Sequence, residues 1–473
     1  MDDRTYESPF SWRYGRVEMR ALFSERERRR LWRAVWVALA RSQERSGLVT
    51  PEELADLQAH AGEIDLEAAL AIEREIGHDL MAEIRVFASQ AKTGGGKLHL
   101  GATSMDVEDT VETYRMRCAL GMIGESLHAL LSAFAARVLQ YADTVCMGYT
   151  HLQPAEPTTL GYRLASYAQD LLIDEVQLRA AYDALTAKGI RGAVGTSASY
   201  ELLLRGSGRR ARDQEQDVLD RFDLSARDVS GQTYPRKLDY LLLCGLAGLG
   251  ASLSKFAADV RVLGSPGFGE LFEPFGSKQV GSSSMPFKRN PVLSERIGSL
   301  ARLLPAHAGV VWQNAATNFL ERTLDDSANR RTVLPESFLC ADEILTLARK
   351  VVQGLRVDER RIAQNLRAYG AFAGSEAVLL EAVKAGGDRQ GLHEVLRDAS
   401  MRAYEHIERG GDNPLAQLLV DQPDLTALLD PAEIRTLLDP TGHVGDAPER
   451  ARALAARIAE LTPFPKPRTL VEA

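Results

Sequence analysis

The segment with the most chemically useful side chains is GSSSMPFKRNP, residues 281–291, which follows a glycine-rich stretch at 264–276. Asn290 and Pro291 predict the start of a helix, with Asn290 as the N-cap and Pro291 in the first helical position. Ser282 and Lys288 would then lie beside a helix N-terminus, where exposed backbone N–H groups favour anions. From composition alone, the same residues also fit a solvated linker that ends in an ordinary cap.

Two further segments hold histidines close to hydroxyl or amide side chains. Residues 150–155 read THLQPA and place His151 just before a predicted long helix. Residues 99–106 read HLGATSMD and contain His99, Thr103 and Ser104. A histidine suits proton transfer, because its unperturbed pKa of about 6.5 lies near the working pH. Considered singly, a histidine at a helix start is more often structural, and residues 99–106 fit a turn and cap.

Residues 322–331, which read RTLDDSANRR, indicate phosphate binding. Arginine side chains and a hydroxyl at a helix start are the groups that bind phosphate. The alternative is a solvated, charged helix cap in which Asp325 and Asp326 pair with the arginines.

Taken together, these segments resemble the aspartase/fumarase superfamily. Residues 281–291 match its GSSxMPxKxNP signature at every fixed position. The resemblance implies that Ser282 is the general base that removes a proton beside a carboxylate. Lys288 and Asn290 would hold that carboxylate as it becomes a dianion. Since free serine is a poor base, Ser282 would need a closed loop and nearby positive charge.

The other segments fit the same superfamily. Residues 150–155 resemble its THxQPA motif, which implies that His151 is the general acid toward the leaving nitrogen. Glu295 resembles the carboxylate that orients this histidine, although an acid in a first helical turn is also explained by the helix dipole. Residues 99–106 resemble an HxGxTSxD motif, which implies that Thr103 and Ser104 bind the fumarate half of the substrate and that His99 lies beside them.

Within this superfamily the chain resembles the adenylosuccinate lyases, most closely the animal type. Residues 322–331 resemble the motif in which Arg322, Ser327 and Arg331 hold the nucleotide phosphate and ribose. The other residues that the resemblance places at the substrate are Arg13 and Tyr14 (phosphate), His78 and Asp79 (substrate wall), Gln232 (succinyl group) and Arg296 (fumarate carboxylates). The chain departs from the animal type at Gly77, where a basic residue is usual, and at 191–200, RGAVGTSASY, which is closer to bacterial relatives.

The resemblance predicts a carbon–nitrogen lyase of purine biosynthesis that needs no metal or organic cofactor. It would release fumarate from adenylosuccinate, giving AMP, and from the succinyl-aminoimidazole-carboxamide ribotide, giving AICAR. The alternatives are a paralogous lyase that acts on another substituted succinate and a carboxymuconate-type cycloisomerase. The substrate in the preferred interpretation is a small-molecule nucleotide.

Composition limits the other possibilities. The net charge of −8, with 57 basic and 65 acidic residues spread along the chain, gives no basic field for nucleic acid. Four cysteines without a CxxC pair predict neither a disulfide framework nor a zinc site. The first residues lack the pattern of a signal peptide, so a cytoplasmic location is expected. The apolar segment 240–253 is too short and glycine-rich for a membrane span, which predicts a core helix.

The elements that must position these residues are long helices. Apolar residues repeat every three or four positions over 116–141 and 158–185, and 240–263 is apolar nearly all round at its start. No alternating β-branched run predicts a major sheet. We expect an all-α fold of the aspartase/fumarase type, with units 1–105, 106–356 (a long central bundle carrying the loop 264–291) and 357–473. Such helices need further neighbours, and the resemblance implies a homotetramer formed through the bundle, with active sites shared between subunits.

Overall fold

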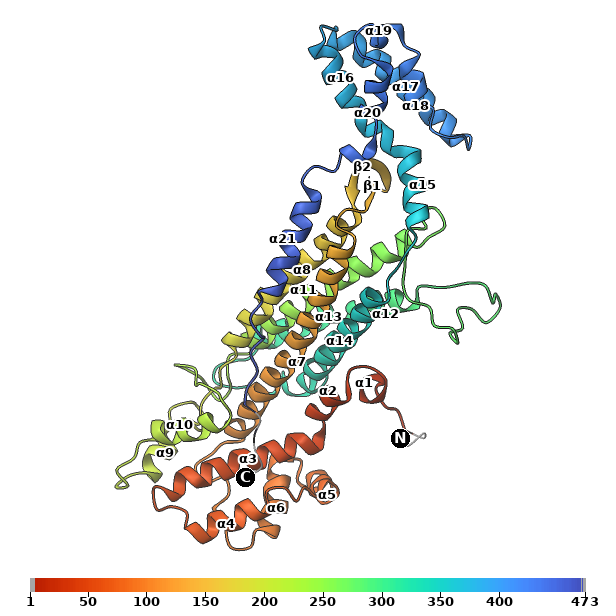
Figure 1. Ribbon diagram of the computed structural model, residues 1–473. Coiled ribbons are helices and arrows are strands. Elements are labelled where there is room, and N and C mark those ends of the chain that lie inside the picture. Colours follow the sequence, from red (N-terminus) through yellow and green to blue (C-terminus); the bar gives the residue numbers. More distant parts are fainter. Residues whose placement is uncertain (1–4, 469, 471–473) are drawn as a thin grey trace.

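The computed structural model describes residues 5–468 and 470, which form an elongated, largely helical molecule (Figure 1). A bundle of long helices occupies the middle, with a smaller helical unit at each end. The predicted all-α fold with a long central bundle is therefore confirmed.

The N-terminal unit is built of short helices around α3. Its elements are α1 (Pro9–Trp12), α2 (Val17–Leu22), α3 (Glu25–Glu44), α4 (Pro51–His60), α5 (Leu66–Ile76), α6 (Asp79–Gln90) and the 3₁₀ helix η1 (Gly95–Lys97). Buried Arg29 and Arg33 of α3 both pair with the Glu83 carboxylate of α6, which ties these two helices together. The short helices α9 (Ala198–Leu203) and α10 (Ala211–Arg221) share the hydrophobic core of this unit, although they follow much later in the chain.

The central bundle contains the longest helices. They are α7 (Ser104–Gln140), α8 (Leu160–Ala184), α11 (Lys237–Leu263), α12 (Val292–Ala301), α13 (Leu303–Ala316) and α14 (Ser327–Gln353). The segments predicted at 116–141, 158–185 and 240–263 correspond to α7, α8 and α11, with α7 beginning earlier than its apolar stripe. Sequence analysis expected a helix start within 322–331 but did not predict the full length of α14, because Pro335 and the charged run at its start interrupt the helical pattern.

Aromatic contacts join the bundle helices at their centre. The ring of Phe256 from α11 lies 5.1 Å from Phe134 of α7 and 5.3 Å from Tyr167 of α8, both edge to face. By length and composition, α7 and α11 are each apolar enough to cross a membrane. Both are core helices of the bundle here, as predicted for 240–253.

Strands make up little of the described chain. β1 (Val145–Thr150) and β2 (Gln153–Thr159) form an antiparallel hairpin, and β3 (Leu271–Phe272) pairs with β4 (Arg356–Val357). The hairpin follows α7 and leads directly into α8. The prediction that no major sheet is present is confirmed for residues 5–468 and 470.

The C-terminal unit has its own hydrophobic core, which includes Val378, Leu396, Leu419 and Ile434. Its elements are α15 (Glu359–Tyr369), η2 (Gly370–Gly374), α16 (Ser375–Lys384), α17 (Arg389–Glu408), α18 (Leu415–Val420), α19 (Pro423–Thr426), α20 (Pro431–Leu437) and η3 (Pro440–Gly442). The last helix, α21 (Ala447–Ala459), runs back along α7 and α8 and packs into the core of the bundle. Leu470, which follows this helix, packs against the hydrophobic core of the N-terminal unit.

Candidate active site

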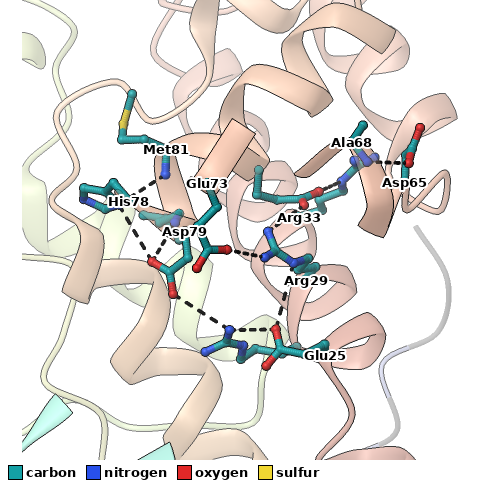
Figure 2. Close-up of polar contacts among 12 residues, drawn as sticks. Glu25, Arg29, Arg33, Asp65, Ala68, Glu73, His78, Asp79 and Met81 are labelled. Carbon is teal, nitrogen blue, oxygen red and sulfur yellow. Dashed lines mark hydrogen bonds and ion pairs between the residues drawn. The ribbon is translucent and has the colours of Figure 1, made fainter. Parts of the chain in front are cut away.

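Several predicted substrate-binding residues meet where the N-terminal unit joins the bundle. His78 is the N-cap of α6, and its Nδ1 accepts a hydrogen bond of 3.4 Å from the Met81 amide (Figure 2). Its Nε2 lies 3.5 Å from Ser104 Oγ in the first turn of α7. Gly77 ends α5 with a φ of +68°, a conformation that favours glycine. The positive φ at this position explains why the chain has glycine there, where the resemblance led us to expect a basic residue.

His99 and Thr103 lie beside this group. His99 Nδ1 accepts a hydrogen bond of 3.1 Å from the indole Nε1 of Trp36. Burial lowers the pKa of His99, and the negative charge of Asp106 only partly opposes this effect. Thr103 is the N-cap of α7, and its N–H donates to Asp106 Oδ2 at 2.9 Å. The imidazole of His99 is therefore held neutral at neutral pH, next to the hydroxyls at the start of α7.

The predicted phosphate ligands come to the same place from the start of α14. Arg331 pairs with Asp79 at 2.8 Å, and Asp79 also lies 3.8 Å from Arg28 of α3. Burial alone would raise the pKa of Asp79, but the two guanidinium groups hold it below its usual value. Arg322 pairs with Asp326 at 2.6 Å, which is the internal ion pair that sequence analysis gave as the alternative to phosphate binding.

A cavity lies between α3, the start of α7 and the start of α14. It is lined by three predicted residues, Arg322, Ser327 and Arg331. Sequence analysis missed the other charged residues that line it, which are Glu25, Arg28, Glu108, Asp109, Glu112, Arg115 and Arg330. Most of these lie in charged helical runs that match no motif. The one available signal was spacing, because Glu108 follows Ser104 by four residues and so shares its helix face.

Gln232 links two segments at this end of the bundle. Its Nε2 donates to the Ala193 carbonyl at 3.1 Å, within the unusual segment 191–200. Its backbone N–H donates to the carbonyl of Glu321, the neighbour of Arg322, at 3.1 Å. Gln232 thus lies next to the segment that carries the predicted phosphate ligands.

Arg13 and Tyr14 lie elsewhere on the N-terminal unit. The Arg13 guanidinium packs 5.7 Å from the Trp12 ring and 5.8 Å from the Tyr14 ring. The N–H of the following Gly15 donates to Glu343 of α14 at 3.1 Å. Neither Arg13 nor Tyr14 lines the cavity at Arg322.

The loop that contains the signature residues 281–291 projects from the bundle between β3 and α12 (Figure 1). Ser282 is half-buried, and its Oγ accepts hydrogen bonds from the N–H groups of Ser284 (3.3 Å) and Met285 (3.1 Å). Asn290 Nδ2 donates to the Gly281 carbonyl at 2.8 Å. A Cβ on Gly281 would lie 1.9 Å from the Lys288 carbonyl oxygen, so the loop closes on itself only with glycine there.

The predicted cap of the following helix is wrong. Asn290 is not the N-cap of α12, which begins at Val292 after Pro291. The carboxylate of Glu273 instead accepts from the N–H groups of Leu293 (3.0 Å) and Ser294 (2.8 Å). An anionic side chain of this chain therefore already occupies the helix N-terminus that was expected beside Ser282 and Lys288. The Lys288 side chain has no hydrogen-bond partner in the described part of the chain, and Lys288 is exposed.

Glu295 lies in the first turn of α12, as predicted, and Arg296 follows it in the same helix. Glu295 is exposed and Arg296 is half-buried. Within residues 5–468 and 470, neither side chain makes a hydrogen bond or ion pair. Glu295 therefore orients no histidine of its own chain.

His151 does not lie at a helix start, which corrects the prediction. It occupies the turn of the β1–β2 hairpin, with φ values of +53° for His151 and +62° for Leu152. Its side chain is exposed and has no polar partner among the described residues. Two successive non-glycine residues in the left-handed region store backbone strain of the kind that clusters at functional sites.

One chain does not bring all the predicted residues together. The cavity lies at the start of α7, whereas the hairpin with His151 follows the end of that helix (Figure 1). A helix of 37 residues is roughly 55 Å long at 1.5 Å per residue. The predicted residues thus form separate groups at the α7 start, in the signature loop with α12, and at the hairpin tip.

Comparison with known proteins gives the family. Residues 15–303 match the family described as Lyase, and residues 372–454 match the one described as Adenylosuccinate lyase C-terminus. An adenylosuccinate lyase of Schizosaccharomyces pombe is 35% identical over 98% of this chain and 97% of its own length. One of Schistosoma mansoni is 36% identical over 88% of this chain and 87% of its own. The chain belongs to the adenylosuccinate lyase family. The resemblance predicted from the sequence is therefore confirmed.

The fold of this adenylosuccinate lyase family member is shared with related enzymes. A 3-carboxy-cis,cis-muconate lactonizing enzyme from Pseudomonas putida has a TM-score of 0.83 to it at 27% identity, covering 95% of this chain and 99% of that one. The aspartase/fumarase-type fold was predicted and is confirmed.

Proposed function

We propose that this protein is an adenylosuccinate lyase of purine biosynthesis, acting in the cytoplasm. It cleaves adenylosuccinate to AMP and fumarate, and the succinyl-aminoimidazole-carboxamide ribotide to AICAR and fumarate. The observation that carries the proposal is the identity of about one residue in three to such lyases over nearly the whole chain. The cavity formed by α3, α7 and α14 supports it, because it gathers arginine and hydroxyl side chains suited to a phosphate.

The nucleotide end of the substrate would occupy this cavity. Arg322 and Arg331 would bind the phosphate, and the Ser327 hydroxyl would bind a phosphate or ribose oxygen. In the described structure both arginines are paired with carboxylates, so the substrate must compete with Asp326 and Asp79. The succinyl half would extend toward His78, Thr103 and Ser104.

The elimination would proceed through residues of the other two groups. The Ser282 alkoxide takes a proton from the carbon next to a carboxylate, which leaves a dianion held by Lys288 and Asn290. The carbon–nitrogen bond then breaks, a carbon–carbon double bond forms, and His151 donates a proton to the departing nitrogen. Binding the dianion more tightly than the substrate supplies the acceleration.

Such a site needs more than one subunit. The separation of His151 from the cavity along α7 supports a shared site. The side chains of His151 and Glu295 also have no polar partner in the part of the chain that the structure describes. Large apolar side chains are also exposed on the bundle, namely Tyr162, Ile173 and Val176 of α8, Leu241 of α11 and Trp312 of α13. Exposed apolar surface of this kind favours association of bundles, so we propose a homotetramer.

The test is to mix the purified protein with adenylosuccinate, follow the ultraviolet change, and identify AMP and fumarate by chromatography. Rapid release of both products supports the proposal. Elimination from a smaller substituted succinate, with no turnover of adenylosuccinate, would instead favour a paralogous lyase. The sequence features that favour this alternative are Gly77 and the segment 191–200, where the chain departs from the animal type.

A further inference from the structure

Glu108 is one of the acidic residues of the cavity to which the proposed function gives no role. It lies on α7, one turn after Ser104, and lines the cavity together with Arg322, Ser327 and Arg331. Glu108 is partly buried, and its carboxyl group makes no hydrogen bond or ion pair within residues 5–468 and 470. A carboxyl group in the space proposed for a phosphate is unexpected, since two anions repel each other.

The arginines around Glu108 are already paired with other acids. On the α3 and α7 side, Arg28 pairs with Glu25 at 2.7 Å and Arg115 pairs with Glu112. Glu108 therefore gains no direct ion pair from either helix.

The same holds on the side of α14. Arg330 pairs with Asp239 at 2.8 Å. Arg322 and Arg331 pair with Asp326 and Asp79, as described above. Ionised Glu108 would thus add negative charge that no neighbouring cation offsets by direct contact.

The surroundings favour the neutral form of Glu108. Burial is the largest influence, and the carboxylates of Asp79 and Asp109 add to it, whereas Arg28 and Arg331 oppose it. Together they raise the pKa of Glu108 to about 8. A bound phosphate would add further negative charge and favour the neutral form still more.

We propose that Glu108 is a positioning residue for the nucleotide, which donates a hydrogen bond from its neutral carboxyl group to a phosphate oxygen. This inference rests on the proposed function. A hydrogen bond from a neutral acid to an anionic oxygen is short and strong. The cavity then binds a phosphate although it is lined by several acids, and binding is linked to the protonation of one side chain.

The linkage has a definite sign. Below about pH 8 most of Glu108 carries its proton and the phosphate binds. Above pH 8 it ionises, so binding must first take up a proton. If only the neutral form binds, the affinity for AMP falls roughly 30-fold between about pH 7 and about pH 9.5, because each unit above the pKa lowers the protonated fraction tenfold.

The experiment measures AMP binding to the intact protein by titration calorimetry across this pH range. It is repeated in buffers of different ionisation enthalpy, which gives the number of protons taken up. Glu108→Gln keeps a donor that does not ionise, so it should bind AMP with little dependence on pH and without proton uptake. Glu125→Gln is the matched control, because Glu125 lies on the same helix and pairs with Lys466 far from the cavity.

The possible results separate this inference from the proposed function. Uptake of about three quarters of a proton per AMP by the wild type at about pH 8.5, lost only in Glu108→Gln, supports it. Equal pH dependence in the wild type and Glu108→Gln overturns it. Proton uptake with adenosine as well as AMP would move the contact to the ribose and overturn the assignment to phosphate. If AMP binds to neither protein, the proposed function fails and the inference with it.

Discussion

The ammonium group of Lys188 lies 2.6 Å from Asp106 Oδ1, and both side chains are almost completely buried. Asp106 stands in the first turn of α7, three residues after Thr103. It also accepts hydrogen bonds from the N–H groups of Arg191 and Gly192 and from the Tyr200 hydroxyl. One carboxylate therefore fixes the unusual segment 191–200 to the helix start that carries Thr103 and Ser104.

Replacing this carboxylate should destabilise the protein strongly. Asp106→Asn leaves the buried Lys188 charge without a counterion, which costs about 3–5 kcal/mol when a buried pair loses one partner. Urea unfolding followed by circular dichroism measures this loss. Asp388→Asn is the control, because Asp388 is an exposed N-cap of α17 and asparagine caps helices equally well. A loss below about 1 kcal/mol for Asp106→Asn would show that the pair does not hold this segment.

Ser282→Ala should abolish most of the activity and leave the fold intact. Ser282 lies outside the hydrophobic core and its hydroxyl accepts hydrogen bonds only within its own loop, so its removal changes no core contact. Loss of a general base lowers kcat by roughly 10²–10⁴-fold. The measurement is the rate of fumarate release, with thermal unfolding to check the fold. Ser284→Ala in the same loop should retain its activity, and near-normal turnover of Ser282→Ala would rule out Ser282 as the base.

The sequence predicted the long helices because their apolar spacing is regular, and it predicted the functional segments because their motifs are specific. It did not predict contacts between distant segments. Glu273 caps α12 from 20 residues away, whereas capping rules consider only neighbouring residues, which favoured Asn290. Arg331 meets Asp79 across 252 residues of chain.

Local propensity also misplaced His151. The strand β2 reads QPAEPTT and contains two prolines, so the pattern did not predict a hairpin. The structure forms it because β1 supplies the partner strand. Which site residues lie close together in space could not be predicted from the sequence either, because it depends on where helices about 40–55 Å long begin and end.

His99 should make stability depend on pH. Burial lowers its pKa in the folded state, so the unfolded chain binds a proton more readily as the pH falls. The stabilisation is complete above pH 6.5, the ordinary value, and is lost as the pH drops below it. Melting temperatures from about pH 7.5 to about pH 5.5 test this sign. The wild type should lose more stability on acidification than His99→Gln, and parallel curves would contradict the effect.

A shared active site predicts that two inactive variants restore activity when mixed. His151→Ala and Ser282→Ala each lack one group of every site. If His151 and Ser282 of a site come from different subunits, random reassembly gives about one quarter of the sites both native groups. The two variants are unfolded together, refolded and assayed for fumarate release, with each variant refolded alone as the control. Recovery near one quarter of wild-type activity supports sites built from several subunits. The contrary result is a mixture that stays as inactive as its components although native mass spectrometry detects mixed oligomers. Both groups would then come from one subunit, and the proposal of a shared site would be wrong.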